Sequence, residues 1–203
     1  MSSTEPLLDS TRQPLRRRLL AQRTTFATSP DAPQAQAALT RHLLVLIRTL
    51  EPDCLGVYWP VRSEFNAPLA LASDTACAML PLALPFVRRD PPQMHYRSWD
   101  GKPPASIDET RIPASNGAEV VPDVVLVPCV GFTAAGYRLG YGGGFFDRWI
   151  AAHPHVTTVG ITWAAAEMRA DEFEPQPHDR PLSLVLTEHG VVPALGDQPA
   201  ASS

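Results

Sequence analysis

Eleven residues, Arg138 to Arg148, combine the residue types that bind a phosphorylated ligand. They read Arg-Leu-Gly-Tyr-Gly-Gly-Gly-Phe-Phe-Asp-Arg and hold four glycines, two arginines and one carboxylate. Glycine lets a backbone approach a ligand closely, and successive free N–H groups in such a loop form an anion site. The arginines suit phosphate oxygens, whereas Asp147 would repel them unless a cation such as Mg²⁺ lies between. The segment therefore predicts a site for a metal-bound nucleotide.

The flanking sequence favours this interpretation over a simple glycine turn capped by surface charges. Residues 123–128 are an apolar run typical of a buried strand, and residues 145–152 favour a helix. A strand, a glycine loop and a helix in this order are the context of a phosphate-binding loop, because the helix adds the positive end of its dipole. A Walker A loop is excluded because Phe145, not lysine, follows the last glycine. A dinucleotide fingerprint would need a third glycine at that same position.

The elements that must position this loop alternate between helices and strands. Apolar residues recur at helical spacing over residues 11–26, 32–49 and 68–78. Besides 123–128, aliphatic and β-branched runs predict strands at 54–59, 83–87, 94–99, 156–163 and 182–187. A long loop rich in Pro, Ser and Asn is expected over 102–122. Strands separated by helices predict a single-domain α/β sandwich with a largely parallel sheet flanked by helices.

Length and composition indicate one globular domain, expected over residues 11–195 with disordered tails at 1–10 and 196–203. The chain has 203 residues, 44% of them apolar and 19% charged, and a formal net charge of −4. Neither a nucleic-acid surface nor a membrane segment is expected from these values. The three cysteines have no CxxC spacing, which argues against a zinc site or a disulfide framework. A cytoplasmic monomer is the expectation.

On these residues, the chain resembles the 5-formyltetrahydrofolate cyclo-ligase family, also called methenyltetrahydrofolate synthetase. The glycine loop matches the family pattern Arg-Leu-Gly-Tyr/Arg-Gly-Gly/Lys-Gly-Tyr/Phe-Tyr/Phe-Asp at every position. Residues 123–137 resemble the strand and the short link that precede it. Further segments, individually weak and persuasive as a set, are similar to family segments in the same order: 12–23, 58–66, 107–109 and 178–190. The resemblance spans most of the chain.

The resemblance implies a fold of the NagB, RpiA and CoA-transferase type and an ATP- and Mg²⁺-dependent ligase. Such an enzyme cyclises 5-formyltetrahydrofolate to 5,10-methenyltetrahydrofolate through a phosphorylated formyl intermediate, with release of ADP and phosphate. Its partners are these small molecules. The chemistry requires alignment and charge neutralisation more than acid or base catalysis.

The resemblance also implies roles for individual residues. Arg138 and Asp147 are expected to be catalytic, and Asp147 and Asp179 to hold Mg²⁺. The expected ATP-binding residues are Arg12, Arg16, Arg138, Leu139, Gly140, Tyr141, Gly142, Gly143, Gly144, Phe145 and Phe146. The expected folate-binding residues are Tyr58, Trp59, Glu64 and Phe145.

Structural roles are alternatives for several of these residues taken singly. Arg12 and Arg16 are also what an exposed helix face carries, and a lone Glu64 is most often a surface carboxylate. Asp179 is also suited to a turn, and Trp59 to the core.

An alternative function follows from two departures from the family pattern. Phe145 and Phe146 stand where the family often has tyrosines, and Arg12 stands where lysine is usual. A non-catalytic relative that binds nucleotide or folate and regulates another process is therefore the second hypothesis. A kinase or ligase that reuses the loop for another small molecule is the third.

Overall fold

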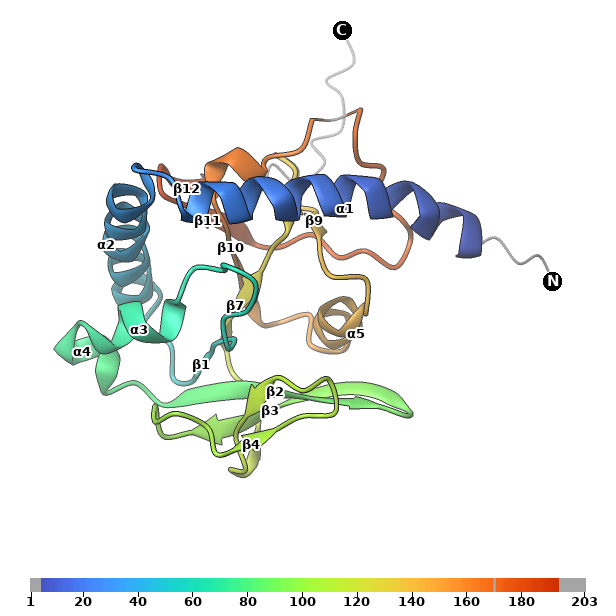
Figure 1. The fold of residues 1–203 in the computed structure, drawn as a ribbon. Coiled ribbons are helices and arrows are strands. Elements are labelled where there is room, and N and C mark those ends of the chain that lie inside the picture. The colour runs from blue at the N-terminus through green and yellow to red at the C-terminus, as the bar shows by residue number, and fades with distance from the viewer. Residues whose placement is uncertain (1–4, 170, 194–203) are drawn as a thin grey trace, which may run out of the picture.

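The computed structural model describes residues 5–169 and 171–193, which form a central sheet with helices on both faces (Figure 1). Of the predicted tails, residues 1–4 and 196–203 lie outside the described residues. Residues 5–10 are helical and form the start of α1 (Glu5–Ala27), which was expected to begin at residue 11. Within the described ranges, no helix has both the length and the apolar character needed to cross a membrane.

The sheet confirms the predicted α/β architecture. Its eight strands lie in the order β12-β11-β10-β7-β1-β2-β3-β6. The five central strands, from β11 to β2, are parallel, and the strands at both edges are antiparallel. The bounds are β1 Leu55–Gly56, β2 Leu82–Arg89, β3 Pro92–Trp99, β6 Glu119–Val120, β7 Val124–Pro128, β10 Thr157–Ile161, β11 Leu184–Thr187 and β12 Gly190–Pro193.

Two short hairpins lie outside this sheet. One pairs β4 (Ser106–Ile107) with β5 (Pro113–Ala114) in the region expected to be a loop. The other pairs β8 (Gly131–Phe132) with β9 (Arg138–Leu139) and forms the connection between β7 and the glycine loop. The second hairpin therefore determines where Arg138 and the loop begin.

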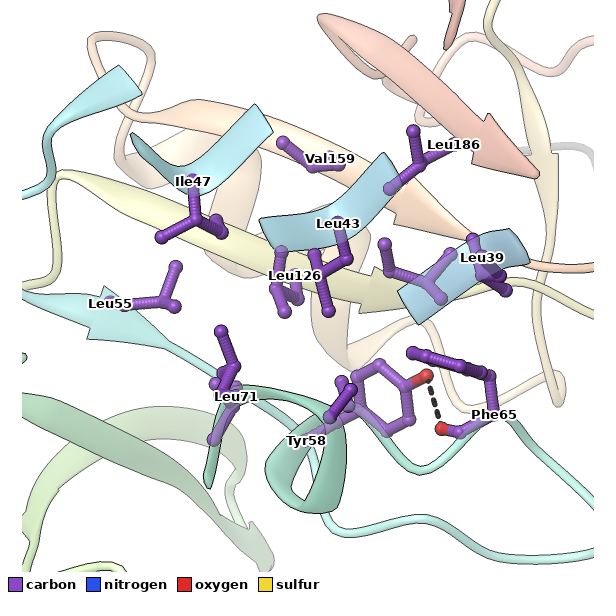
Figure 2. Close-up of a cluster of buried hydrophobic side chains, with 14 of the residues drawn as sticks. Leu39, Leu43, Ile47, Leu55, Tyr58, Phe65, Leu71, Leu126, Val159 and Leu186 are labelled. Carbon is purple, nitrogen blue, oxygen red and sulfur yellow. Dashed lines mark hydrogen bonds between the residues drawn. The ribbon is translucent and has the colours of Figure 1, made fainter. Parts of the chain in front are cut away.

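Both faces of the sheet are buried, because the side chains of β7 alternate between two apolar clusters. Leu126 packs with Leu43 of α2 (Ala32–Leu50) on one face (Figure 2). Val125 and Val127 belong to the cluster that contains Trp149 of α5 (Phe145–Ala152). In α2 the buried residues recur every four positions, which gives one apolar stripe toward the sheet. The buried stripe and the alternation together hold β7 and the glycine loop that follows it.

Helix α1 crosses the carboxyl end of β7 rather than covering a face of the sheet. Its Leu19 packs with Val130 and Leu139, which follow β7 in the chain. Arg23 Nη1 donates a hydrogen bond to the carbonyl oxygen of Cys129 at 3.4 Å. Ligands of parallel α/β sheets bind at the carboxyl ends of the strands. Helix α1 is thus placed beside the predicted phosphate loop.

One predicted helix, 68–78, is divided into α3 (Ala67–Ala72) and α4 (Thr75–Ala78). The division occurs at Asp74, whose side chain accepts a hydrogen bond from the Cys77 N–H at 3.1 Å and so begins a new helix. A short 3₁₀ turn, Ala164–Ala166, follows β10.

Helix α3 is held by an N-terminal cap at the last residue of the predicted folate-side segment 58–66. Asn66 Oδ1 accepts a hydrogen bond from the Leu69 N–H at 3.0 Å. We expect Asn66→Ala to lower the free energy of unfolding by about 1 kcal/mol, the usual cost of losing such a cap. Urea denaturation measures this change. Asp31→Ala is the matched control, because Asp31 occupies the N-cap of α2 without a side-chain capping bond and its replacement should have a much smaller effect. Equal losses in the two variants would show that the Asn66 cap does not stabilise α3.

Candidate functional site

A cavity of about 760 Å³ lies at the carboxyl ends of β1 and β7. Every residue that the sequence analysis assigned to a site lines it, from Arg12 in α1 to Asp179 near the other end of the chain. Its walls come from α1, the segment after β1, β2 with the start of β3, residues 108–112, the glycine loop with the start of α5, and residues 176–179. A second cavity, of about 630 Å³, lies among residues 98–117 and is lined by none of these residues.

The glycine loop presents its backbone N–H groups without acceptors. None of the N–H groups of residues 140–144 donates a hydrogen bond to any other described residue. Gly142 and Gly144 have φ of +94° and +61°, a backbone conformation that favours glycine. The first turn of α5 follows directly, with its positive dipole end toward the loop. This arrangement is suited to the oxygens of an anion.

Two arginines hold the loop from its carbonyl side. Arg16 Nε donates to the carbonyl oxygen of Gly140 at 2.8 Å, and Arg148 Nη2 donates to that of Gly143 at 2.8 Å. The Arg16 guanidinium also lies against Gly142, where an added Cβ would meet it at 3.4 Å. Arg16 is therefore not the solvated charge of an exposed helix face that was the alternative, and its role in binding an anion stays a prediction.

Arg138 and Asp147, both predicted to be catalytic, form an ion pair. Arg138 Nη1 lies 2.9 Å from Asp147 Oδ1, and the two side chains are 4% and 16% exposed. Asp147 belongs to the first turn of α5, where the helix dipole favours a carboxylate. Its second oxygen, Oδ2, accepts no hydrogen bond from any of the described residues. One carboxylate oxygen is therefore available to the cavity.

Arg12 and Asp179 also bind each other. Arg12 Nη2 lies 2.6 Å from Asp179 Oδ2 and Nη1 lies 3.2 Å from Oδ1, so the contact is bidentate. Arg12 further donates to the carbonyl oxygen of Glu174 at 2.7 Å. Burial acts to raise the pKa of Asp179, but the hydrogen bonds from Arg12 and from the Gln176 N–H hold it below its ordinary value. The pair uses most of the bonding capacity of Asp179, so a ligand would share these atoms with Arg12 and with the Gln176 N–H.

Glu64 is buried, in contrast to the surface carboxylate expected of an isolated glutamate. Its side chain is 4% exposed, and its Oε2 accepts from the Val61 N–H at 2.8 Å. The Tyr141 hydroxyl donates to Oε1, and Arg23 Nη1 lies 3.9 Å from the same oxygen. Burial raises the pKa of Glu64, while these hydrogen bonds and the nearby arginines act to lower it. Glu64 thus places a buried carboxyl group in the lining of the cavity.

The two aromatic residues after β1 differ in how they face the cavity. The Tyr58 hydroxyl donates to the carbonyl oxygen of Phe65 at 2.8 Å, and the whole side chain, 2% exposed, lies in the apolar core and offers little surface to a ligand (Figure 2). Trp59 is half-buried and packs edge-on against Trp99, with ring centres 6.2 Å apart.

Arg23 is the main residue of this region that the sequence analysis did not assign. Its guanidinium is buried between the glycine loop and Glu64, where Nη2 donates to the Tyr141 hydroxyl. A signal was present: Arg12, Arg16 and Arg23 are spaced by four and seven residues, which places all three on one face of a helix. Arg62, which lies over the Tyr141 ring at 5.4 Å, had no comparable signal.

A magnesium ion fits this site only as part of a metal–phosphate complex. No group of three or more His, Cys, Asp or Glu residues among residues 5–169 and 171–193 could hold a metal by itself. Mg²⁺ is commonly bound through one or two carboxylates, water and the phosphates of a substrate. The open Oδ2 of Asp147 beside the free N–H groups of the loop is consistent with that mode.

Comparison with known proteins places these residues in a family context. Residues 9–188 match the sequence model of the 5-formyltetrahydrofolate cyclo-ligase family. A 5-formyltetrahydrofolate cyclo-ligase of Haemophilus influenzae is 24% identical over 177 residues, which cover 78% of this chain and 88% of the relative. One from Mycolicibacterium smegmatis is 38% identical over 71 residues, or 34% of this chain and 36% of the relative.

Solved structures support the same fold. The 5,10-methenyltetrahydrofolate synthetase of Aquifex aeolicus aligns with a TM-score of 0.68 at 21% identity, over 93% of this chain and 95% of the other. The synthetase of Mycoplasma pneumoniae aligns with a TM-score of 0.67 at 20% identity, over 86% and 96%. At these identities the likeness concerns the architecture of the chain.

Proposed function

The chain belongs to the 5-formyltetrahydrofolate cyclo-ligase family, and we propose that it is an active ligase that converts 5-formyltetrahydrofolate and MgATP into 5,10-methenyltetrahydrofolate, ADP and phosphate. One observation carries the proposal. A single cavity joins a glycine loop with free N–H groups to a wall that holds a buried carboxylate and aromatic rings. Such a cavity has room for a triphosphate and a pterin side by side.

The reaction has two stages. The formyl oxygen attacks the γ-phosphorus, so that a new O–P bond forms and the bond to the β-phosphate oxygen breaks, releasing ADP. N10 of the folate then attacks the formyl carbon, loses its proton, and the C–O bond to phosphate breaks. The main demand on the protein is to align the two substrates and to balance the phosphate charge.

The nucleotide end of the cavity supplies the charge balance. The N–H groups of residues 140–144 would donate to phosphate oxygens, and Arg138 would hold the transferred group. Asp147 would hold Mg²⁺ through Oδ2. The bound ion would neutralise part of the negative charge of the phosphates. Asp179 would hold the ion through water, because Arg12 binds both of its oxygens. Arg12 and Arg16 would extend the positive wall toward the nucleotide.

The folate end supplies orientation. Glu64 would accept hydrogen bonds from the N–H edge of the pterin, for which an ionised carboxylate is suited. Trp59 and Phe145 would pack against the flat rings of the substrate, and the buried Tyr58 would anchor the segment that carries Trp59. Binding at both ends would bring the formyl oxygen close to the γ-phosphate.

The proposal is tested by omission. We expect the near-ultraviolet absorbance of the methenyl product to increase only when 5-formyltetrahydrofolate, ATP and Mg²⁺ are all present. One ADP should be released for each product formed. Formation of product without ATP, or release of ADP without folate at the same rate, would contradict a coupled ligase.

A non-catalytic relative is the second candidate, favoured by Phe145 and Phe146 in place of tyrosines and by the closed Arg12–Asp179 pair. It predicts tight binding of ATP or folate in calorimetry with no turnover in the same samples. We further propose that the chain acts in the cytoplasm as a monomer. Its three cysteines are free, as a reducing compartment requires.

A further inference from the structure

Tyr141 differs from the glycines around it because it has a side chain, and this side chain binds residues outside the glycine loop. Its hydroxyl donates to Glu64 Oε1 and accepts from Arg23 Nη2. These three residues come from separate parts of the chain, namely the glycine loop, the segment after β1, and α1. The hydroxyl is thus a bridge between an arginine and a carboxylate that lie 3.9 Å apart at their nearest atoms.

The bridge matters because both charged groups are almost fully buried. The side chains of Arg23 and Glu64 are 5% and 4% exposed, so water contributes little to their solvation. A buried charge is tolerated when it is paired and its hydrogen bonds are satisfied. The Val61 N–H occupies Glu64 Oε2, and Tyr141 supplies the one hydroxyl donor to Oε1. Without the Tyr141 hydroxyl, the nearest charged partner of Glu64 Oε1 would be Arg23 Nη1. The two atoms lie 3.9 Å apart, which is too far for a hydrogen bond.

We infer that Tyr141 is a positioning residue that holds the Glu64 carboxylate toward the folate subsite and couples this subsite to the nucleotide loop. The inference rests on the proposed function, since it assigns Glu64 to the pterin. Because Tyr141 lies between Gly140 and Gly142, a phosphate that orders the loop also fixes the donor on Glu64. The Tyr141 ring also contacts the segment after β1, because the Arg62 guanidinium carbon lies 5.4 Å from the ring centre.

The test compares Tyr141→Phe with Tyr137→Phe. Both changes remove one hydroxyl, but the hydroxyl of Tyr137, in the β8–β9 turn, forms no hydrogen bond with any described residue. We expect Tyr141→Phe to weaken binding of 5-formyltetrahydrofolate about ten-fold or more, the effect of losing a hydrogen bond to a charged group. Binding of a non-hydrolysable ATP analogue should change less than about three-fold, because the free N–H groups remain. Calorimetry gives both affinities, and equal folate affinities in the two variants would overturn the inference.

The pH dependence of folate binding separates positioning from general loosening of the structure. The ionisable groups that face Glu64 are Arg23, Arg62, Tyr141, Tyr58 and Cys129. Burial raises the pKa of Tyr58, and that of Cys129 to about 12, so among these groups Glu64 is the one expected to lose its charge as the pH falls. Loss of the Tyr141 donor raises the pKa of Glu64 further. As the pH is lowered, Glu64 should therefore become protonated earlier in Tyr141→Phe than in the unmodified chain. The variant should lose folate binding at a higher pH than the unmodified chain does.

A double variant shows whether Tyr141 acts through Glu64. In a Glu64→Gln background, the additional Tyr141→Phe change should alter folate affinity less than about two-fold, because the carboxylate it orients is gone. A full ten-fold further loss would mean that Tyr141 acts by another route.

A measurement on the unmodified chain covers the case in which Tyr141→Phe does not fold. Coupling through Tyr141 predicts that the ATP analogue strengthens binding of 5-formyltetrahydrofolate several-fold. Independent binding of the two ligands would overturn the coupling. A chain that binds no 5-formyltetrahydrofolate under any condition would instead overturn the proposed function, so the two failures are distinguishable.

Discussion

Replacing Asp147 with asparagine is expected to lower the rate of methenyl-folate formation by about 100-fold or more, the scale of losing one key electrostatic group at a reacting centre. The change removes the charge but leaves an amide oxygen that can still accept from Arg138 at the position of Oδ1. The arginine should therefore keep its place, and the loss should report the missing negative charge at Oδ2. The assay is product absorbance at saturating folate and ATP.

A Mg²⁺ titration identifies what that charge does. If Asp147 holds the ion, Asp147→Asn needs more Mg²⁺ to reach half of its own maximal rate. Asp171→Asn is the control, because Asp171 forms an exposed pair with Arg169 outside the cavity and should leave the rate unchanged. A variant at residue 147 with a near-normal rate would remove Asp147 from the metal site. A slow variant with unaltered Mg²⁺ dependence would assign it to orienting Arg138 alone.

Arg138→Met is expected to have the largest combined effect on stability and activity. It removes a buried guanidinium and leaves Asp147 without its partner, which costs about 3–5 kcal/mol for a buried pair. The lower value is expected here, because Asp147 retains contact with the cavity. Affinity for ATP should fall about 10- to 100-fold, since a charged hydrogen bond to phosphate is lost. Urea denaturation and calorimetry measure the two effects.

Combining the two changes separates stability from function. Arg138→Met with Asp147→Asn removes both charges, so much of the lost stability should return, as it does when a buried ion pair is replaced as a unit. Activity should not return, because neither the phosphate contact nor the metal contact is restored. Arg169→Met, which breaks an exposed pair, serves as the control and should cost less than about 1 kcal/mol. Recovery of activity in the double variant would show that the pair has only a structural role.

The parts of the fold that local sequence determines were predicted well. The helix at 145–152 has the predicted bounds, because the glycines end abruptly and an apolar, helix-compatible segment follows. The largely parallel sheet follows from strands that alternate with helices. In contrast, the β8–β9 hairpin has strands of two residues each, too short for any period to be visible in the sequence.

The site was predicted as a set of residues but not as a set of contacts. The structure brings all of them into the lining of one cavity. That Arg138 pairs with Asp147, and Arg12 with Asp179, had no signal in the sequence. Local patterns report the face on which a side chain lies. They do not report which partner it meets, whether that partner is nine positions away, as Asp147 is from Arg138, or 167, as Asp179 is from Arg12. The roles of these residues in binding and catalysis stay predictions.

The contact between Arg12 and Asp179 also has a consequence for biosynthesis. Its two residues are separated by 167 positions, and Arg12 further bonds the backbone of Glu174. A ribosome delivers the helix that carries Arg12 long before the segment that carries Asp179. A nascent chain can thus build most of its parallel strands while this wall of the cavity still lacks one side. The wall can close only after residue 179 has been synthesised, so stabilisation by the proposed nucleotide would begin after that point and not before it.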